Sequence, residues 1–315
     1  MEYLYLLICL AVIVFSADWL VAGAVTIAKR FHISDFVIGA VIVGVGTSFP
    51  ELVVSSIGAI EGKSDIALGN VIGSNIFNVL GILGLTAMIM PVAVSKENRR
   101  FDLPFCIVLS VLTLLLVYNF FIGNGEAVIS HIDGLILLLI FGLFMWLSLR
   151  SNKKEEVTVE MVITNKQLSI GVGKVFLGLG ALILSSRFFL NNAIAIAEAW
   201  GVSEAFISIT LVACGTSIPE LAASLVAASK KNTQLALGNV IGSNIFNLSL
   251  ILGVGSQITN LTSSNINAVD YAMMIFAAIV PLLLGFKGKL NRWAGAFMFA
   301  CFVAYNIYLI SMQVN

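Results

Sequence analysis

The sequence GTSFPELVVSS at residues 46–56 returns in altered form as GTSIPELAASL at residues 215–225. A second stretch, GNVIGSNIFN, occupies residues 69–78 and recurs without any change at residues 238–247. In both cases the second copy begins 169 positions after the first (215 minus 46, and 238 minus 69). Chance does not produce ten identical residues at a constant spacing, so the chain contains an internal duplication.

The composition is that of a protein that crosses a membrane several times. Of the 315 residues, 59% are hydrophobic and 11% are charged, and the mean hydropathy is +1.03. Soluble domains carry roughly a quarter of charged residues. The formal net charge is zero, and the basic residues are spread over short loops, so we expect no nucleic-acid partner. The cysteines show neither metal-site nor disulfide spacing and are expected to be small buried side chains: Cys9, Cys106, Cys214 and Cys301.

Apolar segments long enough to span a bilayer, about 20 residues each, predict an all-α integral membrane protein. The expected transmembrane helices, ten in number and five in each half, cover residues 3–28, 35–60, 66–90, 102–121, 130–149, 170–199, 204–229, 235–257, 269–286 and 292–312. We divide the chain into a first five-helix repeat at 1–150, a short cytoplasmic linker at 151–168 and a second repeat at 169–315. The linker is too short to hold a regulatory domain.

Lysine and arginine indicate how the helices are oriented. Fifteen of the 17 basic residues lie in or beside loops that follow odd-numbered helices; the exceptions are Lys63 and Arg187. Because such loops stay in the cytoplasm, we expect a multi-pass protein of the plasma or inner membrane with both termini extracytoplasmic. Five helices per half is an odd number, so the second repeat must enter from the opposite side. Inverted repeats are common in secondary transporters, whose sites lie near the midplane.

Each copy of the first motif places a glutamate, Glu51 or Glu220, directly after a proline in an apolar segment. Proline removes one backbone hydrogen bond and frees the carbonyl four residues earlier. Broken helices of transporters use such carbonyls to coordinate ions. A charged residue inside a membrane is costly and indicates a functional site. A plain proline kink with a hydrogen-bonded glutamate is the simpler alternative, but it does not explain an inverted repetition.

The second motif contributes small and polar residues. Its glycine pairs, spaced four apart, predict close packing between helices. Serine and asparagine four residues apart share one helix face, so Ser74 with Asn78, and Ser243 with Asn247, can supply oxygens to the glutamates. Asn75 and Asn244 point elsewhere, and their roles stay open between cross-helix bonding and the site. Two carboxylates, together with hydroxyl, amide and carbonyl oxygens, form a set of ligands that suits Ca²⁺ and also Na⁺.

These motifs resemble those of the sodium/calcium exchangers in the cation/calcium exchanger superfamily, and in particular prokaryotic-type members without a regulatory domain. The motifs that carry the resemblance are GTSFPE and GTSIPE, each followed by GSNIFN. The resemblance implies antiport of Ca²⁺ and Na⁺ by alternating access, with helices 1 and 6 sliding. It implies no cofactor and no partner beyond the two ions and the lipid bilayer. As calcium ligands it implies Glu51, Glu220 and the carbonyls of Thr47 and Thr216. As sodium ligands it adds Ser48, Ser74, Ser217, Ser243 and the carbonyls of Gly44 and Ala213, with Asn78 and Asn247 lining the centre.

One residue departs from the pattern of the family that the chain resembles, because a prokaryotic exchanger and the potassium-dependent exchangers carry aspartate where this chain has Asn247. We therefore expect transport without potassium. Proton-coupled cation antiport by the same fold stays open as an alternative. We expect no enzyme activity, because a hydrolase using Ser48 or Ser217 would need a base, and no histidine or lysine is placed mid-membrane. A passive channel is disfavoured by the inverted repeat.

Overall fold

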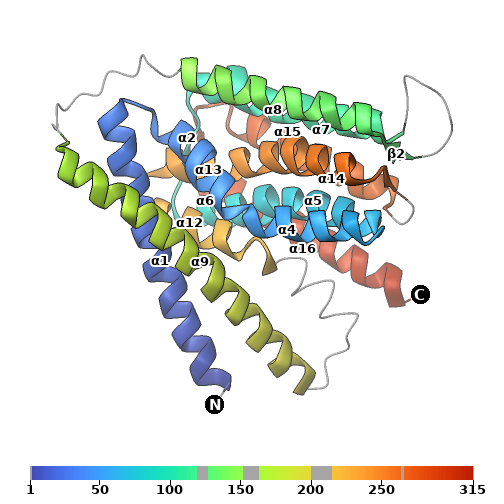
Figure 1. The fold of residues 1–315 in the computed structure, drawn as a ribbon, viewed down its shortest axis with the longest axis horizontal. Coiled ribbons are helices and arrows are strands. Elements are labelled where there is room, and N and C mark those ends of the chain that lie inside the picture. Colours follow the sequence, from blue (N-terminus) through green and yellow to red (C-terminus); the bar gives the residue numbers. More distant parts are fainter. Residues whose placement is uncertain (1, 119–126, 152–162, 200–214, 264–265, 315) are drawn as a thin grey trace.

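The computed structural model describes residues 2–118, 127–151, 163–199, 215–263 and 266–314. Within these ranges the chain is almost entirely helical (Figure 1). The expected all-helical membrane architecture is confirmed at this level. Many large apolar side chains lie on the outside, among them Phe176, Leu139 and Ile307. Such exposure suits surfaces that face lipid rather than water.

The first half contains α1, one helix that is bent at a break, two continuous helices that include π-helical turns, and α8. Its elements are α1 (Glu2–Phe31), α2 (Asp35–Ile38), η1 (Gly39–Gly44), α3 (Val45–Thr47), α4 (Phe49–Ile60), α5 (Ser64–Ile76), η2 (Phe77–Leu83), α6 (Gly84–Ile89), β1 (Val92–Ala93), η3 (Asn98–Asp102), α7 (Leu103–Val117), β2 (Val128–Ile129) and α8 (His131–Ser151). The η elements are π-helical, a conformation with wider turns that often occurs at functional sites.

From α12 onward, the described elements of the second half follow the same order, except that η3 has no counterpart among them. The described elements of this half are α9 (Asn165–Ala199), α12 (Ile218–Ser229), α13 (Thr233–Phe246), η5 (Asn247–Ile251), α14 (Leu252–Ile258), β3 (Leu261–Thr262), α15 (Ala268–Leu284), β4 (Lys289–Leu290) and α16 (Arg292–Val314). Helix α9 begins five residues before its predicted start at 170, so the end of the predicted linker 151–168 is helical. Thr164 and Gln167 explain the early start, because each side chain bonds the backbone N–H of the other in a capping box.

The described part of the chain contains seven helices long and apolar enough to cross a membrane. An eighth span is obtained if the segments Asp35–Thr47 and Phe49–Ile60, bent by 46° at a short break, are counted together. The other two predicted spans, 204–229 and 269–286, contain the shorter helices α12 and α15. Part of the first of these, residues 200–214, lies outside the described residues. The count of ten therefore stays a prediction.

Two short antiparallel ribbons join the halves of the chain to each other. In one, β1 pairs with β4 through Val92 and Leu290; in the other, β2 pairs with β3 through Ile129 and Leu261. Each ribbon thus takes one strand from each half. The two halves form one body around a shared core, in which buried residues of α5 and α13 belong to the same cluster.

Helix α13 lies at the centre of the molecule, and every residue from Leu235 to Phe246 is buried. A β-carbon on Gly238 would lie 2.1 Å from the carbonyl oxygen of Phe36, and one on Gly242 would lie 2.4 Å from the α-carbon of Ala40. The backbones of α13 and of α2–η1 are therefore in contact, which confirms the packing role predicted for this glycine pair. For Gly69 and Gly73, no described atom lies within 4 Å of the corresponding position.

Helices α1 and α9 pack against each other and cross the remaining helices at a steep angle (Figure 1). A β-carbon on Gly23 would lie 2.5 Å from the carbonyl oxygen of Gly171, and one on Gly178 would lie 2.7 Å from the backbone nitrogen of Leu20. Because small residues let the two backbones approach this closely, α1 and α9 form a paired unit.

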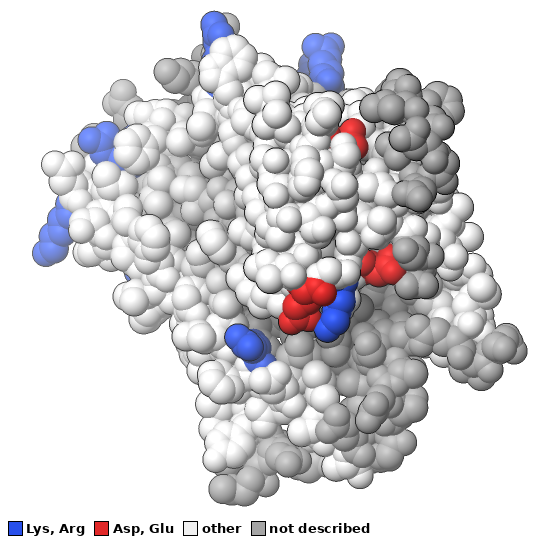
Figure 2. Space-filling view, turned by 45° about the vertical axis from the view of Figure 1, so that its right-hand side comes forward, with Lys and Arg blue, Asp and Glu red and all other residues white. Residues whose placement is uncertain are grey.

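Charged side chains are few on the visible surface. Figure 2 shows a largely uncharged face, with a small group of acidic and basic side chains near the centre of the view and other Lys and Arg at the left and upper margins. A surface with so few charged side chains is expected where a protein faces lipid.

Candidate ion-binding site

The site begins at a break in the second predicted helix. Helix α3 ends at Thr47, α4 begins at Phe49, and Ser48 between them leaves helical geometry with φ −84° and ψ 9°. Pro50 lies in the first turn of α4 and lacks the N–H that would continue the helix. Ser217, with φ −93° and ψ 12°, precedes α12 in the same way. The two copies of the motif therefore fold into the same kind of helix start.

Glu51 and Glu220 each lie in the first turn of the helix that follows the break, and both are completely buried. Each accepts a hydrogen bond from the serine of the other copy. Ser48 Oγ donates to Glu220 Oε1 at 2.8 Å, and Ser217 Oγ donates to Glu51 Oε1 at 2.9 Å. These reciprocal bonds bring the starts of α4 and α12 face to face, with two carboxyl groups in one buried site.

Two asparagines of the second motif bond the helices that carry the glutamates. Asn70 Nδ2 donates to the backbone carbonyl of Glu51 at 3.2 Å and to Ser55 Oγ at 3.0 Å. Asn239 Nδ2 does the same for Glu220, at 3.1 Å, and for Ser224, at 2.9 Å. Asn70 and Asn239 were not among the predicted site residues. Their signal was available, because both belong to the ten-residue stretch that is identical in the two copies.

Further predicted oxygens lie next to the glutamates. Ser217 Oγ is also 3.3 Å from Ser74 Oγ, and Ser243 Oγ donates to the carbonyl of Gly44 at 3.2 Å. Thr47 Oγ1 lies 3.3 Å from Asn239 Oδ1. In the other copy, Thr216 Oγ1 lies 3.4 Å from Asn70 Oδ1. Each threonine therefore reaches the asparagine of the opposite copy. Ala213 lies outside the described residues.

Asn78 and Asn247 are both fully buried, but they have different surroundings. Asn78 Nδ2 donates to Asn244 Oδ1 at 3.0 Å, and Asn244 Nδ2 donates to the carbonyl of Asn75 at 3.1 Å. Asn75 Nδ2 instead bonds the carbonyl of Val71 in its own helix. Neither side-chain polar atom of Asn247 has a hydrogen-bond partner among the described residues. The question left open for Asn75 and Asn244 is thus answered in part, because Asn244 bonds across helices.

Several buried oxygens of the site have no hydrogen-bond donor within the described structure. These are the second carboxyl oxygens of Glu51 and Glu220 and the side-chain oxygens of Asn75, Asn78 and Asn247. Buried polar atoms are normally paired, and leaving them unpaired costs free energy. The described residues form no cluster of three or more His, Cys, Asp and Glu side chains that could hold a metal ion. The polar groups that surround Glu51 and Glu220 are hydroxyls, amides and carbonyls, and their oxygens suit a hard cation.

A family model described as "Sodium/calcium exchanger protein" matches residues 1–150 and 170–311. The chain belongs to the sodium/calcium exchanger family. The resemblance predicted from the repeated motifs is confirmed. This family member is 30% identical to the sodium/calcium exchanger MaX1 of Methanosarcina acetivorans over 98% of both chains. It is 32% identical to the inner membrane protein YrbG of Escherichia coli, over 89% of this chain and 87% of that protein.

The fold of this family member also agrees with that of a solved exchanger. A structure of the sodium-calcium exchanger NCX_Mj superposes with a TM-score of 0.84 at 30% identity, covering 96% of this chain and 97% of the other. Family membership, the apolar helices and this likeness together establish a multi-pass membrane protein. The ligand roles assigned to individual residues stay predictions.

Proposed function

We propose that this protein is a secondary active antiporter that exchanges Ca²⁺ for Na⁺ at a mid-membrane site containing Glu51 and Glu220. The observation that carries the proposal is the reciprocal pair of serine–glutamate bonds, Ser48 to Glu220 and Ser217 to Glu51. They join two carboxylates from opposite halves of the chain in a fully buried position. The names of the relatives MaX1 and NCX_Mj support the same two ions.

The chemistry of the site follows from charge. Two carboxylates balance one divalent cation, and oxygen ligands with flexible geometry suit Ca²⁺. When Ca²⁺ leaves, the buried carboxylates need other positive charge, which Na⁺ supplies. This competition for one site couples the two fluxes. In the proposal, Ca²⁺ is held by Glu51, Glu220 and the carbonyls of Thr47 and Thr216. The proposed sodium ligands add Ser48, Ser74, Ser217, Ser243 and the carbonyls of Gly44 and Ala213, with Asn78 and Asn247 at the centre.

Alternating access would follow from inverted repeats. The bonds around the glutamates come in pairs related by the offset of 169 residues, as those of Asn70 and Asn239 do. The ribbons support the same relation, because β1 and β3 lie 169 positions apart (261 minus 92) and each pairs with a strand of the other half. In the proposed topology, ten helices form two inverted repeats with cytoplasmic odd loops, and both termini lie outside a plasma or inner membrane.

Sodium coupling and proton coupling can be separated in vesicles that contain the purified protein. We expect an outward sodium gradient to drive Ca²⁺ uptake, and a pH gradient of equal size without sodium to drive little. Uptake driven by the pH gradient alone would favour the proton-coupled alternative. Calcium flux that needs neither counter-ion would indicate a channel and contradict the proposal.

A further inference from the structure

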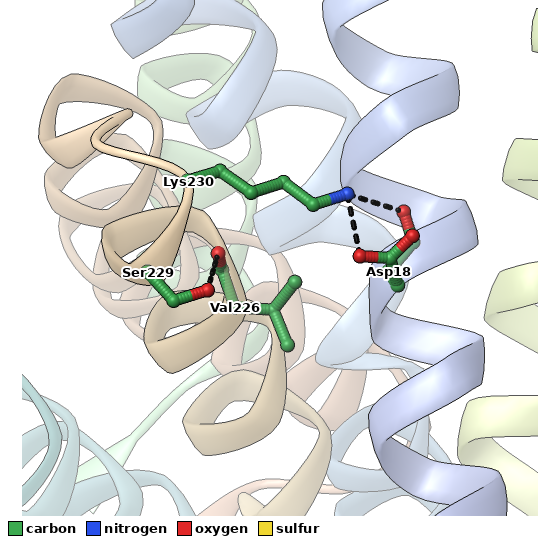
Figure 3. Close-up of polar contacts among 4 residues, drawn as sticks. All are labelled: Asp18, Val226, Ser229 and Lys230. Atoms are coloured by element: carbon green, nitrogen blue, oxygen red, sulfur yellow. Dashed lines mark hydrogen bonds and ion pairs between the residues drawn. The ribbon is translucent and has the colours of Figure 1, made fainter.

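An ion pair outside the site links the α1–α9 unit to the end of a site helix. Lys230 caps the end of α12, and its Nζ lies 2.6 Å from Asp18 Oδ1 and 3.3 Å from the backbone carbonyl of Asp18 on α1 (Figure 3). This ion pair connects two helices far apart in the sequence, whereas the pair between Lys63 and Glu61 joins neighbours in one turn.

The duplication supplies a second pair with both charges reversed. The residue 169 positions after Asp18 is Arg187 on α9, and the residue 169 positions before Lys230 is Glu61, which caps the end of α4. An aspartate–lysine pair in one half therefore corresponds to an arginine–glutamate pair in the other. An incidental surface contact gives no reason for opposite charges to recur at both equivalent positions.

The second pair is open in the conformation described. Glu61 instead contacts Lys63 at 2.7 Å, and both side chains are at least half exposed. No ion pair of Arg187 occurs among the described residues. One member of the duplicated contact is thus closed while its counterpart is open. This is the pattern expected if a moving unit meets the two site helices in turn.

The interface between the α1–α9 unit and α12 leaves room for such movement. A cavity of about 220 Å³ lies between Ile13 and Val14 of α1, Phe189 of α9, and Leu221 and Leu225 of α12. Apolar contacts are non-directional and do not fix the position of one helix along another. A contact of 2.6 Å between charged atoms does fix it, and a shift of one helical turn, about 5.4 Å, would break it.

We propose that Asp18–Lys230 and Arg187–Glu61 are two latches that close alternately during the transport cycle. The first holds the α1–α9 unit against the end of α12 in the conformation described. The second forms in the opposite conformation, when the unit has moved toward the end of α4, and Lys230 is then released. This inference rests on the proposed alternating-access function. The four residues position the moving unit and do not touch the transported ions.

Cysteine cross-linking tests the latches directly. In a chain without its native cysteines, Asp18→Cys is combined with Lys230→Cys, and Arg187→Cys with Glu61→Cys. A short bifunctional methanethiosulfonate is the probe, and the protein is in vesicles with varied Ca²⁺ and Na⁺ on either side. We expect both pairs to cross-link, and any ion condition that raises one yield to lower the other. Each cross-link should stop Ca²⁺ uptake, and reduction should restore it.

The neighbouring residues Trp19 and Phe188, which are equivalent in the two halves and exposed, provide matched controls. Trp19→Cys with Lys230→Cys, and Phe188→Cys with Glu61→Cys, should cross-link far less, because adjacent helix residues point about 100° apart. The latch inference is wrong if the 187–61 pair does not exceed its control, or if both latch yields rise and fall together. Absence of sodium-driven uptake in the unmodified protein would instead count against the proposed function, whatever the cross-linking pattern.

Charge exchange provides a second measurement that needs no cross-link. Asp18→Arg combined with Lys230→Glu installs the charges of the other latch, and it should keep wild-type exchange. Either reversal alone should shift the balance between the two conformations roughly two- to fivefold, the range expected for a partly exposed ion pair. The readout is the ratio of labelling of a single cysteine, placed at Ser48, from the two faces of the membrane. Equal ratios in all four proteins would overturn the role of this pair.

Discussion

The two copies of the repeated sequence make the same contacts around the glutamates and different contacts around the asparagines at the end of the second motif, Asn75 with Asn78 and Asn244 with Asn247. Ser48 and Ser217 bond the opposite glutamates at nearly equal distances. By contrast, the side chain of Asn244 donates across to the carbonyl of Asn75, whereas the side chain of Asn75 bonds only its own helix. Identical residues thus receive different partners. A duplicated chain in one conformation need not be symmetric, and the contacts that differ are the ones that can change between conformations.

The largest effect is expected where the copies agree. Glu51→Gln and Glu220→Gln should each abolish calcium exchange, because one remaining carboxylate cannot balance a divalent ion in a buried site. Glutamine is nearly isosteric, so folding should persist. Sodium-driven Ca²⁺ uptake measures the effect, with Glu97→Gln, an exposed carboxylate before η3, as the control. Strong uptake by one of the two site variants would show that the copies are not equivalent.

Replacing either serine should weaken Ca²⁺ binding without abolishing it, and by the same factor in the two copies. Ser48→Ala and Ser217→Ala each remove one hydrogen bond to a carboxylate. Hydrogen bonds to charged groups contribute about 1.5–3 kcal/mol, so the apparent affinity for Ca²⁺ should fall roughly ten- to hundredfold. Ser110→Ala, which removes a buried hydroxyl bonded to Cys106 on α7, should leave the affinity unchanged. If the two variants lose different amounts of Ca²⁺ affinity, the two copies do not contribute equally to the site.

A substitution at Asn247 tests whether this asparagine, which differs from Asn78 in its contacts, influences which ions are transported. Asn247 is buried and unpartnered among the described residues, and Asn247→Asp would add a third carboxylate near two others. Like charges in a low-dielectric site cannot all ionise cheaply, so the variant should bind a proton or an extra monovalent cation. We expect exchange by the wild type to need no potassium, and exchange by the variant to gain sensitivity to pH or potassium. If the flux profiles of the two proteins coincide, residue 247 does not face the ions.

The smallest effect is expected on the stability of the protein when Asn244 or its counterpart Asn75 is replaced. Asn244→Ala removes two cross-helix bonds and should lower the free energy of unfolding by about 1–3 kcal/mol. Asn75→Ala removes only a bond to Val71 in its own helix, and should cost less than about 1 kcal/mol. Thermal unfolding in detergent compares them under conditions that hold one conformation. If both variants lose the same free energy of unfolding, the additional cross-helix bonds of Asn244 do not stabilise the protein.

The repeated motifs were sufficient to predict the glutamates, the helix break before them and the family. Sequence spacing tells which residues share a helix face, so Ser74 with Asn78 could be grouped in advance. It does not tell which residue of another helix lies opposite. The crossed bonds from Ser48 to Glu220 and from Thr47 to Asn239 therefore became visible only in the folded chain.

Other features escaped prediction because their sequence signals were short or ambiguous. The π-helical turns that contain Asn78 and begin at Asn247 depend on tertiary packing, not on a recognisable residue pattern. The start of α9 did have a signal, the capping box of Thr164 and Gln167, but the polar linker before it masked the signal. Asn70 and Asn239 were overlooked because the serines and asparagines nearer the end of the motif offered the more obvious ligands.

Equilibrium binding of radioactive Ca²⁺ to the purified protein tests the two-glutamate site most directly. The account predicts one Ca²⁺ bound per chain, because two carboxylates balance one divalent charge. Na⁺ should displace this ion, and neither Glu51→Gln nor Glu220→Gln should bind it at concentrations that saturate the wild type. Undiminished binding to both variants would contradict the assignment of Glu51 and Glu220 as the calcium ligands.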